Sequence, residues 1–365
     1  MKVLWLSPTL NHYKAKFLSK LQKDYPLDIT VLAGTGREGQ GDPDRNDEAT
    51  FNLIQLPVKK KDFGFSANVR AELKKAIGNY DWIMIPKENK NLLLFVSALW
   101  FRFVAGSRGK KTRFFSYNHP LTLDGPRKTG LLNRLITQFY YNRLDRVIFY
   151  TEKGCQRMID GGFISKGKAF WANNTIDTDE IDRNYTFCLP EQAQPTILFI
   201  GRLVERKRLP ILLEYFNELK KRVELKNLKL IVIGDGPQSH IVEEASKNDS
   251  NIEWKGAITD ESLIAPLMSR ASIVFIPGHS GLSVNHALCY GRPFVTFGNI
   301  HQPPEIDYVR DGEIGLILKG NSQENIDRIA RLLVNFDPEL YNRCYAAGKA
   351  LSVDSWCQRV YKALQ

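Results

Sequence analysis

The chain has 365 residues, of which 43% are hydrophobic and 25% are charged, and its formal net charge is +11 at pH 7. This composition is typical of a globular protein and excludes a disordered one, and the length predicts two domains of roughly 180 residues each rather than one. The five cysteines are widely spaced and form no C-x-x-C pair. They therefore indicate neither a disulfide framework nor a zinc site, and a reducing cytoplasm fits them.

No segment of the sequence is predicted to cross a membrane. The longest apolar run, Leu92 to Phe101, is interrupted by Arg102, well short of the ~20 residues that a spanning helix needs. The N-terminal MKVLWLSPTL has no long apolar core and no small-residue cleavage site, so it does not indicate a signal peptide. We expect a cytoplasmic protein.

The positive charge is confined to the first half of the chain. Residues 1–180 contain 29 Lys and Arg against 18 Asp and Glu, whereas residues 181–365 contain 22 of each. This asymmetry indicates an anionic partner for the first half, either a membrane surface or an acidic substrate. A lipid surface at the inner face of the cytoplasmic membrane is one such partner, and no nucleic acid is expected.

Strands and helices are expected to alternate along the first half, as in a parallel Rossmann-like sheet. Expected strands are 2–7, 27–33, 51–57, 81–85, 113–117, 147–150 and 169–171, and expected helices are 12–23, 68–77, 91–104 and 152–160. A further helix lies within 126–146, where Leu131, Leu132, Leu135, Phe139 and Tyr140 share one stripe. We interpret it as a packed helix with a charged outer face, and a helix lying on an anionic membrane is the alternative.

Three short motifs in the first half resemble functional signatures but lack the neighbouring elements or residues that those signatures need. Gly34 to Gly39 spells G-x-G-x-x-G, but it follows the second expected strand and leads into a loop, so it is not a dinucleotide fingerprint. Gly162 to Ala169 lacks the Ser or Thr of a P-loop. Asp177 and Asp179 resemble a metal-binding carboxylate pair, but such pairs in polar segments are usually only solvated.

Residues 180–194 show no periodicity and are the expected linker to a second alternating half. Expected strands there are 196–200, 228–233, 252–255 and 273–276, and expected helices are 209–222, 239–246, 260–269, 321–336, 338–351 and 355–364, with a short helix starting near Leu282. The predicted domains are 1–183 for an acceptor and 184–345 for a nucleotide sugar, with 346–365 as a helix packing back on the first domain. A cleft is expected between the two.

The stretch from Ile276 to Leu318 contains the strongest candidate site. An apolar strand runs into a Gly-containing loop that opens a helix, an arrangement in which backbone N–H groups can bind a phosphate. His279, His286 and Glu305 lie nearby in sequence. Arg202 and Lys207 follow another strand end, and His119 ends a strand of the first half, which is where parallel sheets place ligand-binding groups.

Five blocks in fixed order resemble the retaining GT-B glycosyltransferases of family four, also called glycosyl transferases group 1. They are VIFYTEKGCQRMI with GKAFWANNTIDTD, ILFIGRLVERKRL, LIVIGDGPQ, IEWKGAITDESL, and ASIVFIPG…GLSVNHALCYGRPFV…PEIDYVRDGEIG, covering residues 147 to about 318. The resemblance implies two Rossmann-like domains and transfer of a sugar from a nucleotide-diphosphate sugar without a metal or other cofactor. It assigns donor binding to Gly201, Arg202, Lys207, Gly234, Gly281, Leu282, Ser283, His286 and Glu305, catalysis to Arg202, Lys207 and His119, and a sugar contact to His279.

The chain departs from the family at its usual Glu-x7-Glu pair. Counting back from Gly291-Arg-Pro293 places His286 at the second Glu and Gly278 at the first. The handling of the donor sugar is therefore open. The expected acceptor is a saccharide or a lipid-linked sugar in surface polysaccharide or glycoconjugate synthesis. A nucleotide-sugar epimerase, a phosphorylase, and a glycan- or nucleotide-binding protein that has lost catalysis are the alternatives.

Overall fold

The computed structural model describes residues 1–10, 12–35, 49–122 and 129–365. It divides into two compact units, Met1–Asn173 with Asp354–Gln365, and Asn174–Val353. The boundaries thus lie at 173/174 and 353/354, where the sequence suggested 183/184 and 345/346. Most of the G-x-G-x-x-G stretch lies outside the described residues.

The first unit is built on a seven-stranded parallel sheet in the order β3-β2-β1-β4-β5-β6-β7. Its strands are β1 (Lys2–Ser7), β2 (Asp28–Ala33), β3 (Asn52–Gln55), β4 (Trp82–Met84), β5 (Arg113–Asn118), β6 (Arg146–Phe149) and β7 (Ala169–Trp171). Its helices are α1 (His12–Asp24), α2 (Ala67–Ala76), α3 (Leu92–Val104), α4 (Gly106–Gly109), α5 (Leu131–Arg143), α6 (Glu152–Asp160) and α14 (Val353–Leu364).

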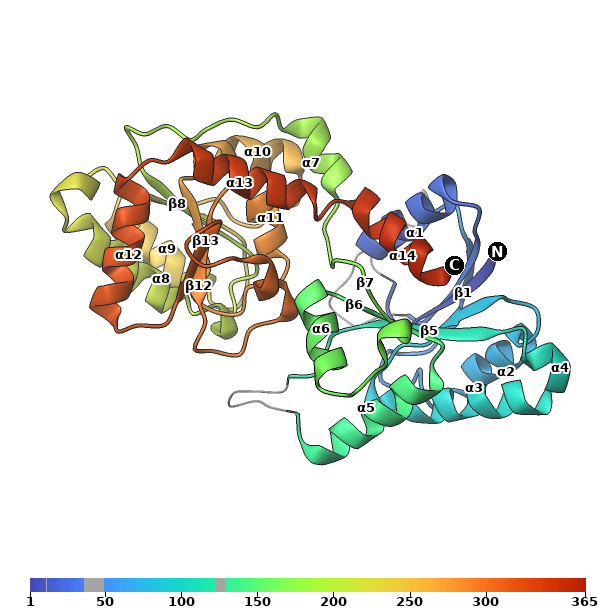
Figure 1. The fold of residues 1–365 in the computed structure, drawn as a ribbon. Helices are drawn as coiled ribbons and strands as arrows, with labels where there is room; N and C mark the ends of the chain where they lie inside the picture. The colour runs from blue at the N-terminus through green and yellow to red at the C-terminus, as the bar shows by residue number, and fades with distance from the viewer. Residues whose placement is uncertain (11, 36–48, 123–128) are drawn as a thin grey trace. The chain divides into compact units, whose positions relative to one another are not determined.

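Helices cover both faces of this sheet. Five of the six residues of β1 and of β2 are buried, as expected where helices lie on both faces of a parallel sheet. Helices α2, α3 and α5 lie on one face, and α1 and α14 lie on the other (Figure 1). The C-terminal helix belongs to this unit because Trp356 packs 6.3 Å from the Trp5 ring and the Trp82 indole donates to the Leu364 carbonyl at 2.8 Å.

Helix α5 contradicts the interpretation of its apolar stripe as a packed one. Leu131, Leu132 and Leu135 are exposed, whereas Tyr140 of the same predicted stripe is buried, together with Thr137 and Tyr141. The packed side is aromatic and lies opposite the leucines. The leucines of the stripe therefore lie on the side of α5 that does not pack on its unit.

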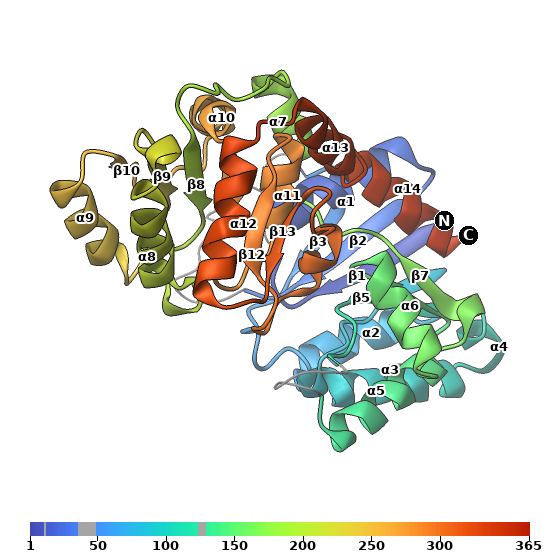
Figure 2. The same cartoon turned by 60° about the vertical axis from the view of Figure 1, so that its left-hand side comes forward.

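The second unit is built on a six-stranded parallel sheet in the order β10-β9-β8-β11-β12-β13. Its strands are β8 (Thr196–Ile200), β9 (Lys229–Ile233), β10 (Ile252–Trp254), β11 (Ile273–Phe275), β12 (Phe294–Phe297) and β13 (Gly315–Leu318). Its α-helices are α7 (Thr178–Asn184), α8 (Leu209–Lys220), α9 (Ser239–Asn248), α10 (Glu261–Arg270), α11 (Ser283–Cys289), α12 (Ser322–Val334) and α13 (Pro338–Lys349). Figure 2 shows α8 and α12 along the strands of this sheet.

The order of the strands places the candidate loops side by side. The chain runs outward from β8 through β9 to β10 and then returns to the other side of β8 with β11. Ligands bind outside the carboxyl ends of parallel strands at such a reversal. The loops that follow β8 and β11, which contain Lys207 and Ser280, therefore meet at the position where this fold binds ligands.

Candidate functional site

The loop after β8 comes close to the loop after β9. Gly234 has φ +145°, and a Cβ placed on it would lie 2.0 Å from the Gly201 carbonyl oxygen. Gly201 itself has φ +147°. Glycine at both positions lets the two loops touch, because a side chain at Gly234 would collide with backbone that cannot move aside.

Lys207 is a buried cation at the junction of the loops that follow β8 and β11. It lies in a 3-10 turn, η4 (Glu205–Lys207), its residue is 8% exposed, and its Nζ donates to the Ser280 carbonyl at 3.0 Å. A Cβ on Gly201 would lie 3.3 Å from this Nζ. Burial and, to a smaller extent, the positive charge of Arg206 lower the pKa of Lys207 to about 8. A lysine held this way is ready to bind an anion, which would restore its charge.

The loop after β11 is held in one conformation by Gln302. The side-chain oxygen of Gln302 accepts from the Ser280 N–H at 3.0 Å and from its hydroxyl at 2.8 Å, and its amide nitrogen donates to the Gly278 carbonyl at 3.0 Å. A Cβ on Gly278 would lie 2.0 Å from the Arg206 carbonyl oxygen. This contact explains why a glutamate does not stand at Gly278, since no side chain fits there without backbone movement.

Helix α11 starts beside the end of β8. The Ser283 hydroxyl donates to the Ile200 carbonyl at 2.9 Å, and Gly281 before it has φ +60°. The N-cap residue Leu282 makes no side-chain capping bond. These contacts bring Gly201, Lys207 and Ser283 together, as the sequence suggested.

His286 on α11 contacts a carboxylate that the sequence analysis did not single out. Its Nε2 lies 2.7 Å from Glu261 Oε1, and the Tyr290 hydroxyl donates to Glu261 Oε2 at 2.6 Å. Burial, with the neighbouring Glu261 carboxylate, raises the pKa of Tyr290, so the phenol keeps its proton and donates. Glu261 is 25 residues from His286, and only the packing of α10 against α11 brings its carboxylate beside the histidine.

Glu305 is buried with one carboxylate oxygen unsatisfied. It lies in the 3-10 helix η6 (Pro304–Tyr308) and is 3% exposed, and its Oε1 accepts from Asn174 Nδ2 at 2.6 Å. The other oxygen, Oε2, has no hydrogen-bond partner among the described residues. Asn285 on α11 donates to the Asn174 carbonyl at 2.9 Å, so these polar groups adjoin the helix that carries His286. An unsatisfied buried carboxylate oxygen can accept a hydroxyl of a bound ligand.

The remaining residues that the sequence analysis discussed make other contacts. Arg202 is exposed, and His279 is partly exposed, with its backbone N–H donating to the Arg206 carbonyl at 2.8 Å. His119 belongs to the first unit, where its ring lies 4.2 Å from the Tyr150 ring. Asp177 caps α7 by accepting from the Glu180 N–H at 3.1 Å. No group of three or more potential metal ligands occurs among the described residues.

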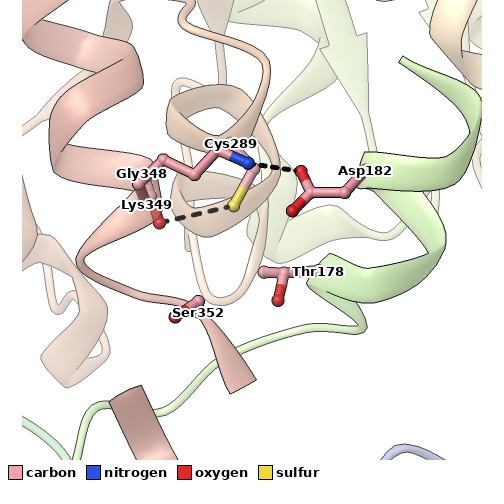
Figure 3. Close-up of a pocket in the computed structure, with 6 residues that line it drawn as sticks. All are labelled: Thr178, Asp182, Cys289, Gly348, Lys349 and Ser352. Carbon is pink, nitrogen blue, oxygen red and sulfur yellow. Dashed lines mark hydrogen bonds and ion pairs between the residues drawn. The ribbon is translucent and has the colours of Figure 1, made fainter. Parts of the chain in front are cut away.

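A separate small pocket lies where α7, α11 and α13 meet (Figure 3). Lys349 and Asp182 form an ion pair of 2.6 Å there, and the Cys289 thiol lies 3.8 Å from the Gly348 carbonyl. Burial raises the pKa of Cys289 to about 12, so its thiol stays protonated and is not a nucleophile. The pocket contains none of the candidate donor-binding residues and is a gap in helix packing.

Three comparisons relate the chain to known proteins. Residues 194–335 match the family model described as glycosyl transferases group 1, and no curated protein matches the chain. Anabaena HepE, solved with UDP, has a TM-score of 0.71 at 14% identity over 100% of this chain and 99% of its own. A glycosyltransferase from Rickettsia africae has a TM-score of 0.69 at 14% identity, covering 100% and 97% of the two chains.

A third solved structure has the same fold. Sucrose-phosphate synthase from Thermosynechococcus elongatus has a TM-score of 0.68 at 13% identity, covering 99% of this chain and 97% of that one. The structural similarity to these proteins covers both units. It confirms the predicted α/β fold of two Rossmann-like domains. These findings support a glycosyltransferase enzyme with the GT-B fold, whose residues 194–335 are similar to the glycosyl transferases group 1 domain.

Proposed function

We propose that this protein is a retaining, metal-independent glycosyltransferase that takes a sugar from a nucleotide-diphosphate sugar bound at the β8/β11 reversal of the second unit. The observation that carries the proposal is the position of Lys207, a buried cation whose Nζ lies beside Gly201 and Ser280. Breaking a sugar–phosphate bond places negative charge on the leaving diphosphate. Lys207, with the exposed Arg202 closing over the anion, supplies fixed positive charge at that point.

The nucleoside end of the donor is assigned to α11. In the tautomer whose Nε2–H donates to Glu261 Oε1, the Nδ1 of His286 is left to accept from a ribose hydroxyl. Glu261 thus fixes the orientation of His286 in the way that a carboxylate orients a metal-bound or catalytic imidazole. In this proposal the His286–Glu261 pair replaces the second glutamate of the family's Glu-x7-Glu pair, and Glu305 Oε2 accepts a sugar hydroxyl.

The acceptor is assigned to the first unit, which contains His119, the catalytic residue of that unit that the family resemblance suggests. A saccharide or lipid-linked acceptor in surface polysaccharide or glycoconjugate synthesis is consistent with the positive charge of residues 1–180. The structures of HepE with UDP and glucose and with UDP-glucose support a nucleotide-sugar donor. We propose that the enzyme works in the cytoplasm, bound peripherally to the inner face of the membrane.

Release of free nucleotide diphosphate from a panel of nucleotide sugars tests this function. Arg202→Ala and Lys207→Ala are each expected to lose about 2 to 4 kcal/mol of transition-state stabilisation, roughly 30- to 1,000-fold in kcat/KM. Lys226→Ala, at an exposed lysine of the same unit, is the control and should turn over normally. Near-normal turnover by either test variant would show that the diphosphate binds elsewhere.

Two alternatives give different results in the same assay. A protein that has lost catalysis releases no diphosphate from any donor. A phosphorylase instead forms a sugar 1-phosphate when it is given a glycan and inorganic phosphate. Either result would replace the transferase proposal.

A further inference from the structure

Helix α3 exposes an apolar stripe to solvent. Leu93, Val96, Trp100 and Phe103 recur at spacings of three and four residues, so they lie on one side of the helix. Trp100 is 61% exposed and Phe103 is 76% exposed. Leu94, Phe95 and Ala98 on the opposite side are buried. A helix that is apolar all round normally lies in a protein core or in a membrane, and α3 lies at the surface of its unit.

Helix α5 adds a second exposed apolar stripe next to the first. The Phe95 ring of α3 stacks on Tyr140 of α5 at 4.2 Å, and Asn89, just before α3, donates to Asn133 at 2.6 Å. The two helices are therefore neighbours, and both figures show them on the same face of the sheet (Figures 1 and 2). Leu131, at 74% exposed, leads the stripe of α5.

The exposed apolar side chains of these two helices form what we call the α3/α5 surface. Of the 14 large hydrophobic residues that are exposed among the described residues, nine belong to it. They are Leu93, Val96, Trp100, Phe103, Val104, Leu131, Leu132, Leu135 and Phe139. Apolar side chains scattered singly over a surface need no explanation, but a contiguous set of this kind marks an interaction site.

The charged residues within the segment that forms the α3/α5 surface are basic, and Asp145, just after it, pairs with Arg102 at 3.0 Å. In the described part of Leu92 to Arg143 there are seven Lys and Arg residues and no acidic one. Arg108, Lys110, Lys111 and Arg143 are exposed. The exposed Phe65 lies near the start of α3, since a Cβ on the preceding Gly64 would lie 2.1 Å from the Lys90 carbonyl. An apolar strip bordered by basic side chains matches an anionic lipid surface in both properties.

We propose that the α3/α5 surface docks the first unit on an anionic membrane. Helix α3 has 13 residues, too few to cross a bilayer that needs ~20, and no described helix is long and apolar enough to do so. The helices therefore lie in the plane of the interface, with Trp100 and the leucines among the acyl chains and the basic side chains at the phosphates. A second copy of this chain fits less well, because self-association through this surface would bring two sets of positive charge together.

Flotation of the full chain with vesicles tests the proposal. The protein is expected to float with vesicles containing about one-third phosphatidylglycerol and to bind pure phosphatidylcholine at least tenfold more weakly. Trp100→Ser with Phe103→Ser should abolish binding to both, because the apolar contact is lost. Lys110→Glu with Lys111→Glu should remove most of the preference for the anionic vesicles, because the electrostatic attraction is reduced.

The double variant Val223→Ser with Lys226→Glu is the matched control. It changes an exposed apolar residue and an exposed lysine of the second unit, and it should bind like the unaltered chain. Equal flotation of the Trp100/Phe103 variant, or no flotation of the unaltered chain at low salt, would overturn the proposal. So would a dimer in sedimentation that the Trp100/Phe103 variant converts to a monomer, since a second copy would then cover the surface.

The docking surface and the donor chemistry are tested separately. The Trp100/Phe103 variant should release nucleotide diphosphate from soluble donors as the unaltered chain does, because neither residue belongs to the donor-binding unit. Loss of flotation with retained release would support the surface whatever the acceptor is.

Discussion

At the residue scale, Lys207 is the group whose chemistry matters most. Its residue is 8% exposed, and burial lowers its pKa to about 8. Arg202 and Lys207 could be recognised from the sequence, because both lie within a few residues of the end of the same strand. The Glu261–His286 contact could not, because it depends on how α10 and α11 pack and joins residues 25 positions apart.

Binding of a nucleotide diphosphate is expected to take up protons at pH 8. About half of the free protein has a neutral Lys207 at that pH, and a bound diphosphate raises the pKa of the lysine and restores its proton. At pH 6 the lysine is already protonated and contributes no uptake. Titration calorimetry in two buffers of different ionisation enthalpy measures the number of protons taken up on binding, at pH 8 and at pH 6.

Lys207→Arg is the control for that experiment, because arginine stays charged and its contribution to proton uptake at pH 8 should disappear. Proton uptake that is the same at pH 6 and pH 8 would show that Lys207 does not contact the diphosphate.

The lowered pKa of Lys207 also makes the stability of the fold depend on pH. Between about pH 8 and 10.5 the unfolded chain keeps the proton that the folded chain has released, so this lysine makes the free energy of unfolding rise with pH over that range.

At the element scale, most strands and helices follow from hydrophobic periodicity in the sequence. Strands β12 and β13 and helix α7 were not predicted. Helix α7 has only seven residues and lies in a polar segment that reads as a linker. The stripe of α5 was assigned to the wrong environment, because periodicity shows that a helix has an apolar side and does not show what covers it.

Replacing Gly348 by alanine is expected to destabilise the second unit by about 1 to 3 kcal/mol, the scale of overpacking in a core. A Cβ at Gly348 would lie 2.3 Å from the Leu288 carbonyl oxygen, where α13 crosses α11. Glycine to alanine inside a helix normally stabilises by up to about 1 kcal/mol, so the sign of the change is diagnostic. Urea unfolding measures it.

Gly167→Ala is the control for this substitution, since nothing lies within 4 Å of a Cβ there and its φ is not in the left-handed region. It should leave the free energy of unfolding within about 0.5 kcal/mol of the original. An unchanged or increased stability of Gly348→Ala would mean that α11 and α13 are not held as closely as the structure has them.

At the scale of the whole molecule, the alternation of strands and helices predicts two parallel-sheet units, and the structure confirms them. The sequence predicts that the loops after β8 and β11 lie together, and they do, because β8 and β11 are adjacent at the reversal of strand order. The side chains that complete the site, Glu261, Asn174 and Gln302, come from three separate segments. Their convergence is a property of tertiary packing that no local pattern encodes.

A crystal of the protein soaked with a nucleotide-diphosphate sugar tests the central claim most directly. The account predicts the diphosphate within hydrogen-bonding distance of Lys207 Nζ and the Arg202 guanidinium, beside Gly201 and Ser283, with the ribose at His286. A nucleotide bound elsewhere, or one whose phosphates do not contact Lys207, would contradict it.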